Sequence, residues 1–260
     1  MLCTVQHLRG FALQASDDSL GCVDDIFFDD VRWAARYFVV DTGNWLNERL
    51  VLISPVAVGE PDWSAELLPV ALSTKQVEDS PPIGTDEPME RHLEHKLVSH
   101  FAWPAYWSDD LPVGRGFSEA ATLGSTQPSK DEGAESVLSE QRTPDPHLRS
   151  AHDVAGYQVN GTDGEVGHVE DLIVDVENWS IRYIIVDTRR FLPGKHVIVS
   201  PDWIDDMDWS RRRMTLDVTS EMFNKAPAYE AGQEIDRDCE KKLYDHFGRT
   251  PYWSSTSTIS

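Results

Sequence analysis

The chain has 260 residues and is acidic, with 45 Asp and Glu residues against 23 Lys and Arg residues and a formal net charge of −22. No region of it is basic, which excludes the electrostatic binding of nucleic acid and attraction to anionic membrane surfaces. The single basic cluster, Arg211–Arg213, follows Asp205, Asp206 and Asp208, and it indicates a charged hairpin rather than a phosphate site. With 40% hydrophobic residues the chain has enough apolar side chains for packed cores.

The beginning of the chain, MLCTVQHLRGFALQAS, contains Arg9 and no apolar run of the length found in signal peptides. No stretch reaches the roughly 18 uncharged apolar residues of a membrane-spanning helix. Cys3, Cys22 and Cys239 are odd in number and do not recur at matching positions, so a disulfide framework is not expected. We therefore expect a cytoplasmic protein with no direct membrane insertion.

An internal repeat dominates the sequence. RYFVVDTGNWLNERLVLISP at 36–55 matches RYIIVDTRRFLPGKHVIVSP at 182–201, a shift of 146 residues. The shift holds without a gap from Gly10 and Gly156 to Trp107 and Trp253, and 28 of the 98 aligned positions are identical. A unit of about a hundred residues has the size of a domain.

Strands are predicted in the same chain order in both copies, because apolar residues alternate between turn-forming residues. In the first copy they are GFAL at 10–13, LGCVDDIFF at 20–28, ARYFVVDT at 35–42 and NERLVLIS at 47–54. In the second they are GYQV at 156–159, EVGHVEDLIVDV at 165–176, IRYIIVDT at 181–188, HVIVS at 196–200 and two short strands within 202–218. Short strands and tight turns favour an antiparallel barrel, since parallel pairs need long crossovers.

Each copy ends in helix. TSEMFNKAP at 219–227 predicts a short helix capped by Thr219 or Ser220, and 234–248 predicts an exit helix that stops at Gly248. Apolar residues at four-residue steps give each exit helix one stripe, Met89, Leu93, Leu97 and Phe101 in the first copy and Ile235, Cys239, Leu243 and Phe247 in the second. Such a stripe must pack on the outside of its barrel, on the other exit helix or on another chain.

The domain map that follows is 1–107, 108–147 and 148–260. The middle segment is rich in Ser, Gly, Pro and Glu and carries a net charge of −5 from 3 basic and 8 acidic residues, which is typical of a flexible linker. We expect each flanking unit to fold alone and the linker to be cleaved first by proteases. We also expect the exit helices to join the two units into a pseudo-dimer, or two chains into a homodimer.

Both units resemble the PRC-barrel family, the small β-barrel found in the photosynthetic reaction centre H subunit and in the C-terminal part of the 16S rRNA maturation factor. The matching residues are LGCVDDIFFDDVRWAARYFVVDT and RLVLISP in the first copy. In the second they are VGHVEDLIVDVENWSIRYIIVDT, KHVIVSPDWI and DWSRRRMTLDV, and PYW follows the helix.

The resemblance implies two small antiparallel PRC-type β-barrels in tandem, each followed by an amphipathic helix. It implies an interaction module without a shared catalytic motif. We therefore expect a non-enzymatic protein that works through contact with a protein partner or in assembly. Two alternatives are an accessory factor for electron transfer, like the H subunit, and an enzyme or metal-binding protein with a carboxylate pocket between the barrels.

Recurring carboxylates are the first candidates for a metal site. They are Asp25, Asp29 and Asp41 with their counterparts Asp171, Asp175 and Asp187. Acids that alternate along a strand are more often its solvated face, and Asp41 and Asp187 sit where a carboxylate caps a turn. We expect no metal, cofactor or catalytic site from them.

Histidines and tryptophans are the other candidates. His92 and His95 are spaced for a metal on a helix, but their counterparts Asp238 and Lys241 favour a solvated helix face. His100 and His246 recur and are expected to hydrogen-bond at the junction of barrel and helix. The recurring tryptophans, expected as packing anchors or partner contacts, are Trp33 and Trp179, Trp63 and Trp209, and Trp107 and Trp253. No nucleophile-elbow, phosphate-loop, dinucleotide, HExxH or CxxC motif occurs.

Overall fold

A computed structural model describes residues 1–47, 49–81, 91–105, 147–188 and 194–256. The described residues form two compact units. The first comprises Met1, Cys3–His152 and Val174–Ser180, and the second comprises Leu2, Asp153–Ile173 and Ile181–Ser260. The units are thus not divided at a single point of the chain, because short segments of each sequence copy belong to the compact unit of the other.

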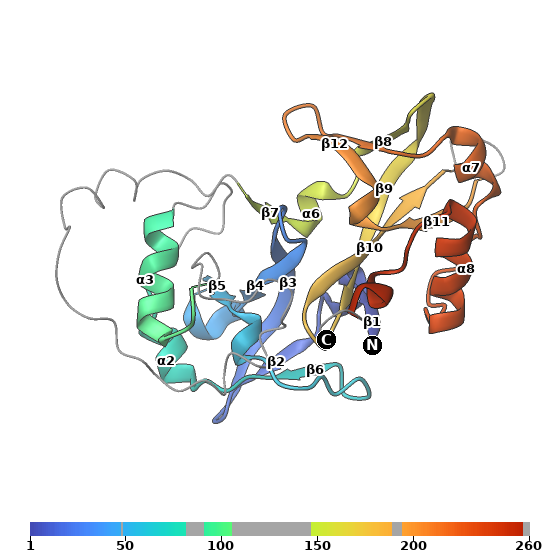
Figure 1. Ribbon diagram of the computed structural model, residues 1–260. Helices are drawn as coiled ribbons and strands as arrows, with labels where there is room; N and C mark the ends of the chain where they lie inside the picture. The colour runs from blue at the N-terminus through green and yellow to red at the C-terminus, as the bar shows by residue number, and fades with distance from the viewer. Residues whose placement is uncertain (48, 82–90, 106–146, 189–193, 257–260) are drawn as a thin grey trace. The chain divides into compact units, whose positions relative to one another are not determined.

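The first unit is mainly β (Figure 1). Its elements in chain order are β1 (Leu2–Thr4), α1 (Val5–Leu8), β2 (Ala12–Gln14), β3 (Ser19–Asp29), β4 (Ala34–Asp41), η1 (Gly43–Leu46), β5 (Leu50–Ile53), η2 (Pro55–Ala57), β6 (Leu67–Pro69), α2 (Thr74–Glu78), α3 (Arg91–Phe101) and β7 (Leu148–Ser150). The strands pair in the order β5-β4-β3-β2-β6, and β7 adds to β3.

The second unit repeats this plan. Its elements are α6 (Ala151–Val154), β8 (Gln158–Gly161), β9 (Gly164–Asp175), β10 (Ser180–Asp187), β11 (His196–Val199), η3 (Pro201–Trp203), β12 (Ile204–Asp208), β13 (Arg213–Leu216), α7 (Ser220–Lys225), α8 (Arg237–Phe247) and η4 (Tyr252–Thr256). Its strands pair in the order β11-β10-β9-β8-β13-β12. Ser180 of β10 pairs with Ala34 of β4, both in the first unit, and the described strands of each unit follow one another in an open order.

The register of the strands repeats at the interval read from the sequence. Asp41 pairs with Leu50 and Asp187 with His196, while Leu13 pairs with Gly21 and Val159 with Gly167. The isolated bridges of the first unit, Val58 to Val70 and Asp62 to Leu67, correspond to the β12–β13 pairs Ile204 to Leu216 and Asp208 to Arg213. The 146-residue shift is therefore a repeat of structure as well as of sequence.

Two pairings correct the expectation of purely antiparallel sheets. β2 pairs with β6 in parallel, and β8 pairs with β13 in parallel. In each copy the strand after the first helix, β2 or β8, pairs with the last strand, and the strands between them serve as the long connection that a parallel pair needs. A parallel pair does need a long crossover, as predicted. The prediction was wrong because it considered only strands that are consecutive in the chain. A mainly β fold with a few helices is confirmed.

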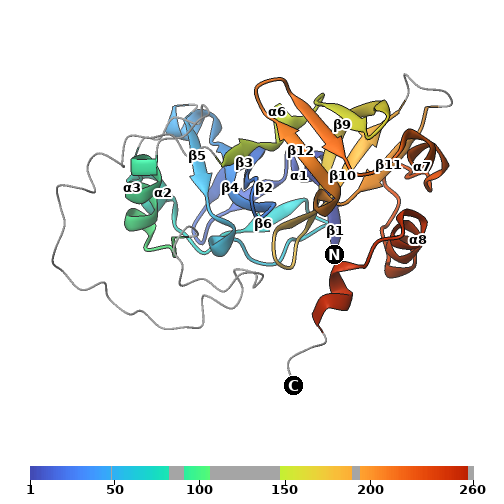
Figure 2. The ribbon, with the colours of Figure 1, turned by 45° about the horizontal axis from the view of Figure 1, so that its top comes forward.

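The exit helices pack on the strands of their own units. Leu97 of α3 is buried against Tyr37, Val39 and Leu52, with Leu93 and Phe101 beside it. In α8, Leu243 is buried and Tyr244 and Phe247 contact Trp203. In both views α2 and α3 lie next to β5, and α7 and α8 lie next to β11 (Figures 1 and 2). A pairing through these helices would need other faces, and it stays a prediction.

The buried stripe of α8 differs from the predicted one. Ile235 precedes the helix and Cys239 is half-buried, whereas Glu240 and Tyr244 are buried. Glu240 accepts a hydrogen bond from the Tyr183 hydroxyl at 2.7 Å, and its other oxygen lies 2.8 Å from Arg237 Nη1. Tyr37 and Glu94 are likewise buried at the same positions of the first unit. A buried tyrosine and a buried glutamate therefore recur at the same positions of both units, which an apolar pattern cannot reveal.

The predicted cap of α7 and the predicted end of α8 are confirmed, whereas α8 begins at Arg237 and not at residue 234. Thr219 caps α7 by accepting the Met222 N–H, and Gly248 ends α8 in the left-handed conformation at φ 62°. Met89, Trp107 and nearly all of the predicted linker lie outside the described residues. Among the helices of the described residues, none has the length and apolar character to cross a membrane.

A strand-docking edge as the candidate functional site

The long strand β3 carries a docked segment on one edge. β7 runs antiparallel to it with the pairs Phe27 to Ser150, Phe28 to Arg149 and Asp29 to Leu148. The Asp30 N–H extends the ladder by donating to the His147 carbonyl at 2.9 Å. Residue 147 ends the predicted linker and residues 148–152 follow it in the sequence, yet all of them belong to the first unit. We call residues 147–152 the docked segment and the side of β3 that pairs with it the docking edge.

The docked segment places an apolar side chain in the core of the first unit. Leu148 has no exposed surface and lies in the cluster that contains Phe27, Tyr37 and Leu97. The next residue, Arg149, points the other way and stays partly exposed, as alternation along a strand requires. Full burial of a leucine contributes about 1.5–3 kcal/mol, so this one side chain contributes substantially to the docking.

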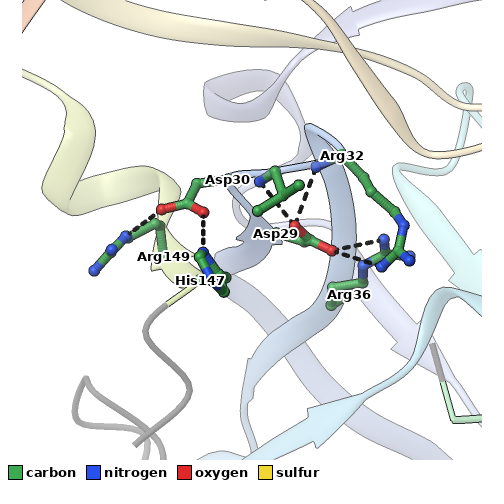
Figure 3. A network of polar contacts seen from close by, with 7 residues as sticks. Asp29, Asp30, Arg32, Arg36, His147 and Arg149 are labelled. Atoms are coloured by element: carbon green, nitrogen blue, oxygen red, sulfur yellow. Dashed lines mark hydrogen bonds and ion pairs between the residues drawn. The ribbon is translucent and has the colours of Figure 1, made fainter. Parts of the chain in front are cut away.

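Asp30 binds the polar side of the same segment (Figure 3). Its Oδ1 lies 3.0 Å from His147 Nδ1 and its Oδ2 accepts from Arg149 Nε at 2.9 Å. Its side chain is only 6% exposed, so the carboxylate is largely withdrawn from water. A charge-assisted bond to a withdrawn carboxylate is stronger than a surface ion pair, and it favours a basic residue at the position of Arg149.

Asp25 holds the end of the docked segment. Its Oδ2 accepts from the Ser150 hydroxyl, and its Oδ1 accepts from the N–H groups of Ile26 and His152 at 2.8 and 3.1 Å. The His152 N–H lies in the first turn of α6, where a carboxylate satisfies an otherwise unpaired donor. Burial raises the pKa of Asp25, although the hydrogen bonds from Ser150, Ile26 and His152 oppose the shift.

The side chain of Asp29 shapes the turn beside the docking edge, whereas its backbone pairs with Leu148 of the docked segment. It accepts from the N–H groups of Val31 and Arg32, and Arg36 Nη2 donates to it at 3.0 Å (Figure 3). Burial opposes its ionisation, but the positive charge of Arg36 and the two N–H groups outweigh burial and lower its pKa. Asp29 therefore stays charged and fixes the β3–β4 turn.

The six recurring aspartates are not one solvated face, which corrects that part of the sequence interpretation. Asp25, Asp29 and Asp187 are buried, at 8%, 4% and 3% exposed. Asp41 is exposed and caps a turn by accepting the Gly43 N–H at 2.8 Å, as predicted. Asp171 and Asp175 are intermediate. Spacing alone missed the burial of Asp25 because its partners Ser150 and His152 are remote in the sequence, whereas the partners of Asp29 lie within seven residues of it.

The other candidates are mostly structural. Nε2 of His100 lies 2.9 Å from the Gln76 carbonyl of α2, and that of His246 lies 2.8 Å from the Met222 carbonyl of α7. Each histidine therefore bonds to a neighbouring helix and not, as predicted, at the junction of barrel and helix. His95 is exposed, and the side chain of His92 lies outside the described residues. Trp179 is 5% exposed and packs edge-on against Phe38.

The residues that make the docking edge specific were missed by sequence reasoning. Asp30, His147, Arg149 and Ser150 correspond to Val176, Met1, Cys3 and Thr4, so none of them recurs. A search based on the repeat discards such positions. The signal that was available is the break in the repeat, where charged residues replace apolar or neutral ones in one copy only.

Comparison with known proteins finds a family match for part of the chain. No curated protein matches the sequence. One family model does match, over residues 146–223, a range that starts immediately before the docked segment and ends within α7. That part of the chain matches the PRC-barrel domain.

Proposed function

We propose that the chain is a non-enzymatic interaction or assembly module whose docking edge captures an extended peptide segment. The observation that carries the proposal is the docked segment itself. It shows an edge of β3 that takes up a strand by backbone pairing, an apolar anchor at Leu148 and ionic contacts at Asp30. Addition of a strand to a sheet edge is a general mode of peptide recognition, in which the backbone supplies affinity and side chains supply specificity.

The sequence that fits this edge can be stated. It has a basic side chain at the position of Arg149 for Asp30, an apolar side chain at Leu148 and a small hydroxyl at Ser150 for Asp25. Another copy of this chain carries the same segment and is the simplest partner. Exchange of identical segments between copies is a low-cost route to assembly.

The match to the PRC-barrel domain supports an interaction role, since that fold serves as a binding module. We extend the assignment to residues 1–107 because their strand registers recur in the matched part of the chain. The acidic composition supports a soluble, cytoplasmic protein with a protein partner rather than nucleic acid or a membrane. A docked strand supports binding more directly than it supports electron transfer or catalysis.

Charge reversal across the docking edge tests the proposal. Asp30→Lys places a lysine next to Arg149 of the same chain, and Arg149→Asp places an aspartate next to Asp30. Each variant therefore has two like charges where the unaltered chain has an ion pair. When the two variants are mixed, the basic docking edge of the first and the acidic docked segment of the second are complementary. We expect the mixture to form a dimer by size exclusion with light scattering, while each variant alone forms fewer dimers.

The double variant Asp30→Lys/Arg149→Asp is the matched control, because it restores complementarity within one chain. It is expected to behave like the unaltered protein. If the mixed variants show no dimer beyond that of the separate variants, while all of them stay folded by circular dichroism, capture of a segment from another chain is refuted.

A further inference from the structure

The geometry points to a divalent metal site of the Zn²⁺ type in the second unit, formed by His168, Glu170, Asp187 and His196. Glu170, Asp187 and His196 each present a ligand atom within 4.8 Å of the other two. His168 adds a second imidazole, with Nε2 3.6 Å from Asp187 Oδ2. The site is separate from the docking edge, which lies in the first unit, so its test does not depend on the proposed function.

Three strands of one sheet bring these four residues together. His168 and Glu170 are two residues apart on β9 and therefore share a face. Asp187 ends β10 and pairs directly with His196, which begins β11. A β-carbon on Gly167 would lie 2.3 Å from the Asp187 carbonyl oxygen, so the glycine allows β9 and the end of β10 to approach this closely.

The backbone around the proposed ligands is fixed. Just beyond Asp187 and His196, Thr188 and Lys195 exchange hydrogen bonds of 2.9 to 3.0 Å. The His196 carbonyl also accepts the Tyr229 N–H at 2.9 Å. Ligands on paired strands lose little freedom when a metal binds, which favours affinity.

The side-chain chemistry suits Zn²⁺ and similar borderline cations, which combine imidazole nitrogen with carboxylate oxygen. Asp187 brings a carboxylate that is 3% exposed, and Glu170 brings a second one. His196 Nε2 is buried and lies 2.7 Å from Glu170 Oε2 without the alignment of a hydrogen bond. Tetrahedral Zn²⁺ ligands lie about 3.4 Å apart. The 3.6 Å between His168 Nε2 and Asp187 Oδ2 is near that spacing, and the exposed Glu170 can rotate to widen its 2.7 Å separation from His196.

The first unit provides an internal reference. The equivalent positions hold Cys22, Asp24, Asp41 and Leu50, so a leucine replaces one imidazole. Asp24 there lies 3.5 Å from Arg9, and Asp41 caps its own turn. The repeat therefore keeps the backbone and changes the ligands, and the complete set of two histidines and two carboxylates belongs to the second unit.

Calorimetric titration of the full chain with ZnCl₂ tests the inference. We expect one Zn²⁺ to bind per chain. Titration with MgCl₂ should show no comparable binding, because Mg²⁺ prefers oxygen ligands. Glu170→Gln and His168→Gln change exposed or partly exposed side chains and keep the fold. Each is expected to weaken Zn²⁺ binding by about tenfold or more.

Asp24→Asn and Cys22→Ser are the matched controls, because they alter the equivalent positions of the first unit. They are expected to leave the affinity unchanged. The inference is overturned if the unaltered chain takes up no Zn²⁺ at micromolar concentration, or if Glu170→Gln and His168→Gln bind as tightly as the two controls.

Discussion

At the scale of single residues, the environment of each carboxylate decides its role. Asp29 and Asp25 are both buried on β3, four residues apart. Asp29 faces Arg36 and keeps a low pKa, while Asp25 has no arginine among its hydrogen-bond partners in the described residues and burial raises its pKa. The first is a permanent charge that fixes a turn, and the second is an acceptor for the docked segment.

The low pKa of Asp29 predicts a loss of stability in acid. Its folded pKa lies below the usual value of 3.8, so the unfolded chain binds the proton more readily. The stabilisation is present above the unfolded value and is lost as the pH falls through the folded pKa. Asp29→Asn should lower the free energy of unfolding at pH 7 by about 3 kcal/mol, since buried Arg36 loses its partner, and should weaken the acid dependence below about pH 4.

Asp24→Asn is the control for that measurement, because Asp24 is an exposed carboxylate on the same strand. Its ion pair with Arg9 is long, at 3.5 Å. Loss of such a pair costs less than about 1 kcal/mol. Urea unfolding of both variants between pH 2 and 7 measures their free energies of unfolding. An equal loss of free energy in the two variants would contradict the prediction that the Asp29 carboxylate stabilises the buried Arg36.

At the scale of elements, the sequence predicted most strands and the exit helices, because their periodicity and turn residues are local. Local signals could not predict the parallel pairs β2–β6 and β8–β13, whose partners are more than 50 residues apart in the chain. The docked segment was missed for the same reason. Leu148 has an apolar side chain in a three-residue strand, and only the distant Phe27 and Tyr37 make it a core residue.

The exit helices give a prediction at this scale. Leu97 and Leu243 are 2% and 1% exposed, and each packs on its own unit. Leu97→Ala and Leu243→Ala should each lower the free energy of unfolding by about 2–5 kcal/mol, since truncation leaves a cavity. Lys96→Ala and Lys242→Ala alter exposed neighbours on the same helices and should change it by less than about 0.5 kcal/mol. Thermal and urea unfolding measure all four, and a small effect of Leu97→Ala would mean that α3 is not held by this contact.

At the scale of the whole molecule, the two compact units do not coincide with the two sequence copies. The docked segment and residues 174–180 come from the second copy and belong to the first unit, and Leu2 belongs to the second unit. Residues 1–107 and 148–260 remain the predicted domains. A fragment that starts at residue 148 nevertheless carries a strand whose partner, β3, is absent from the fragment.

Cleavage of the chain between its copies is the most direct test of the docking edge. A specific protease site inserted after Gly124 allows the purified, folded protein to be cut once, within the predicted linker. We predict that the two pieces remain together in size exclusion at the elution volume of the uncut chain, because the docked segment stays in the first unit. We also predict that Asp25→Ala/Asp30→Ala weakens this association, since both carboxylates hold that segment. Two pieces that separate at once, each folded and monomeric, would contradict the account.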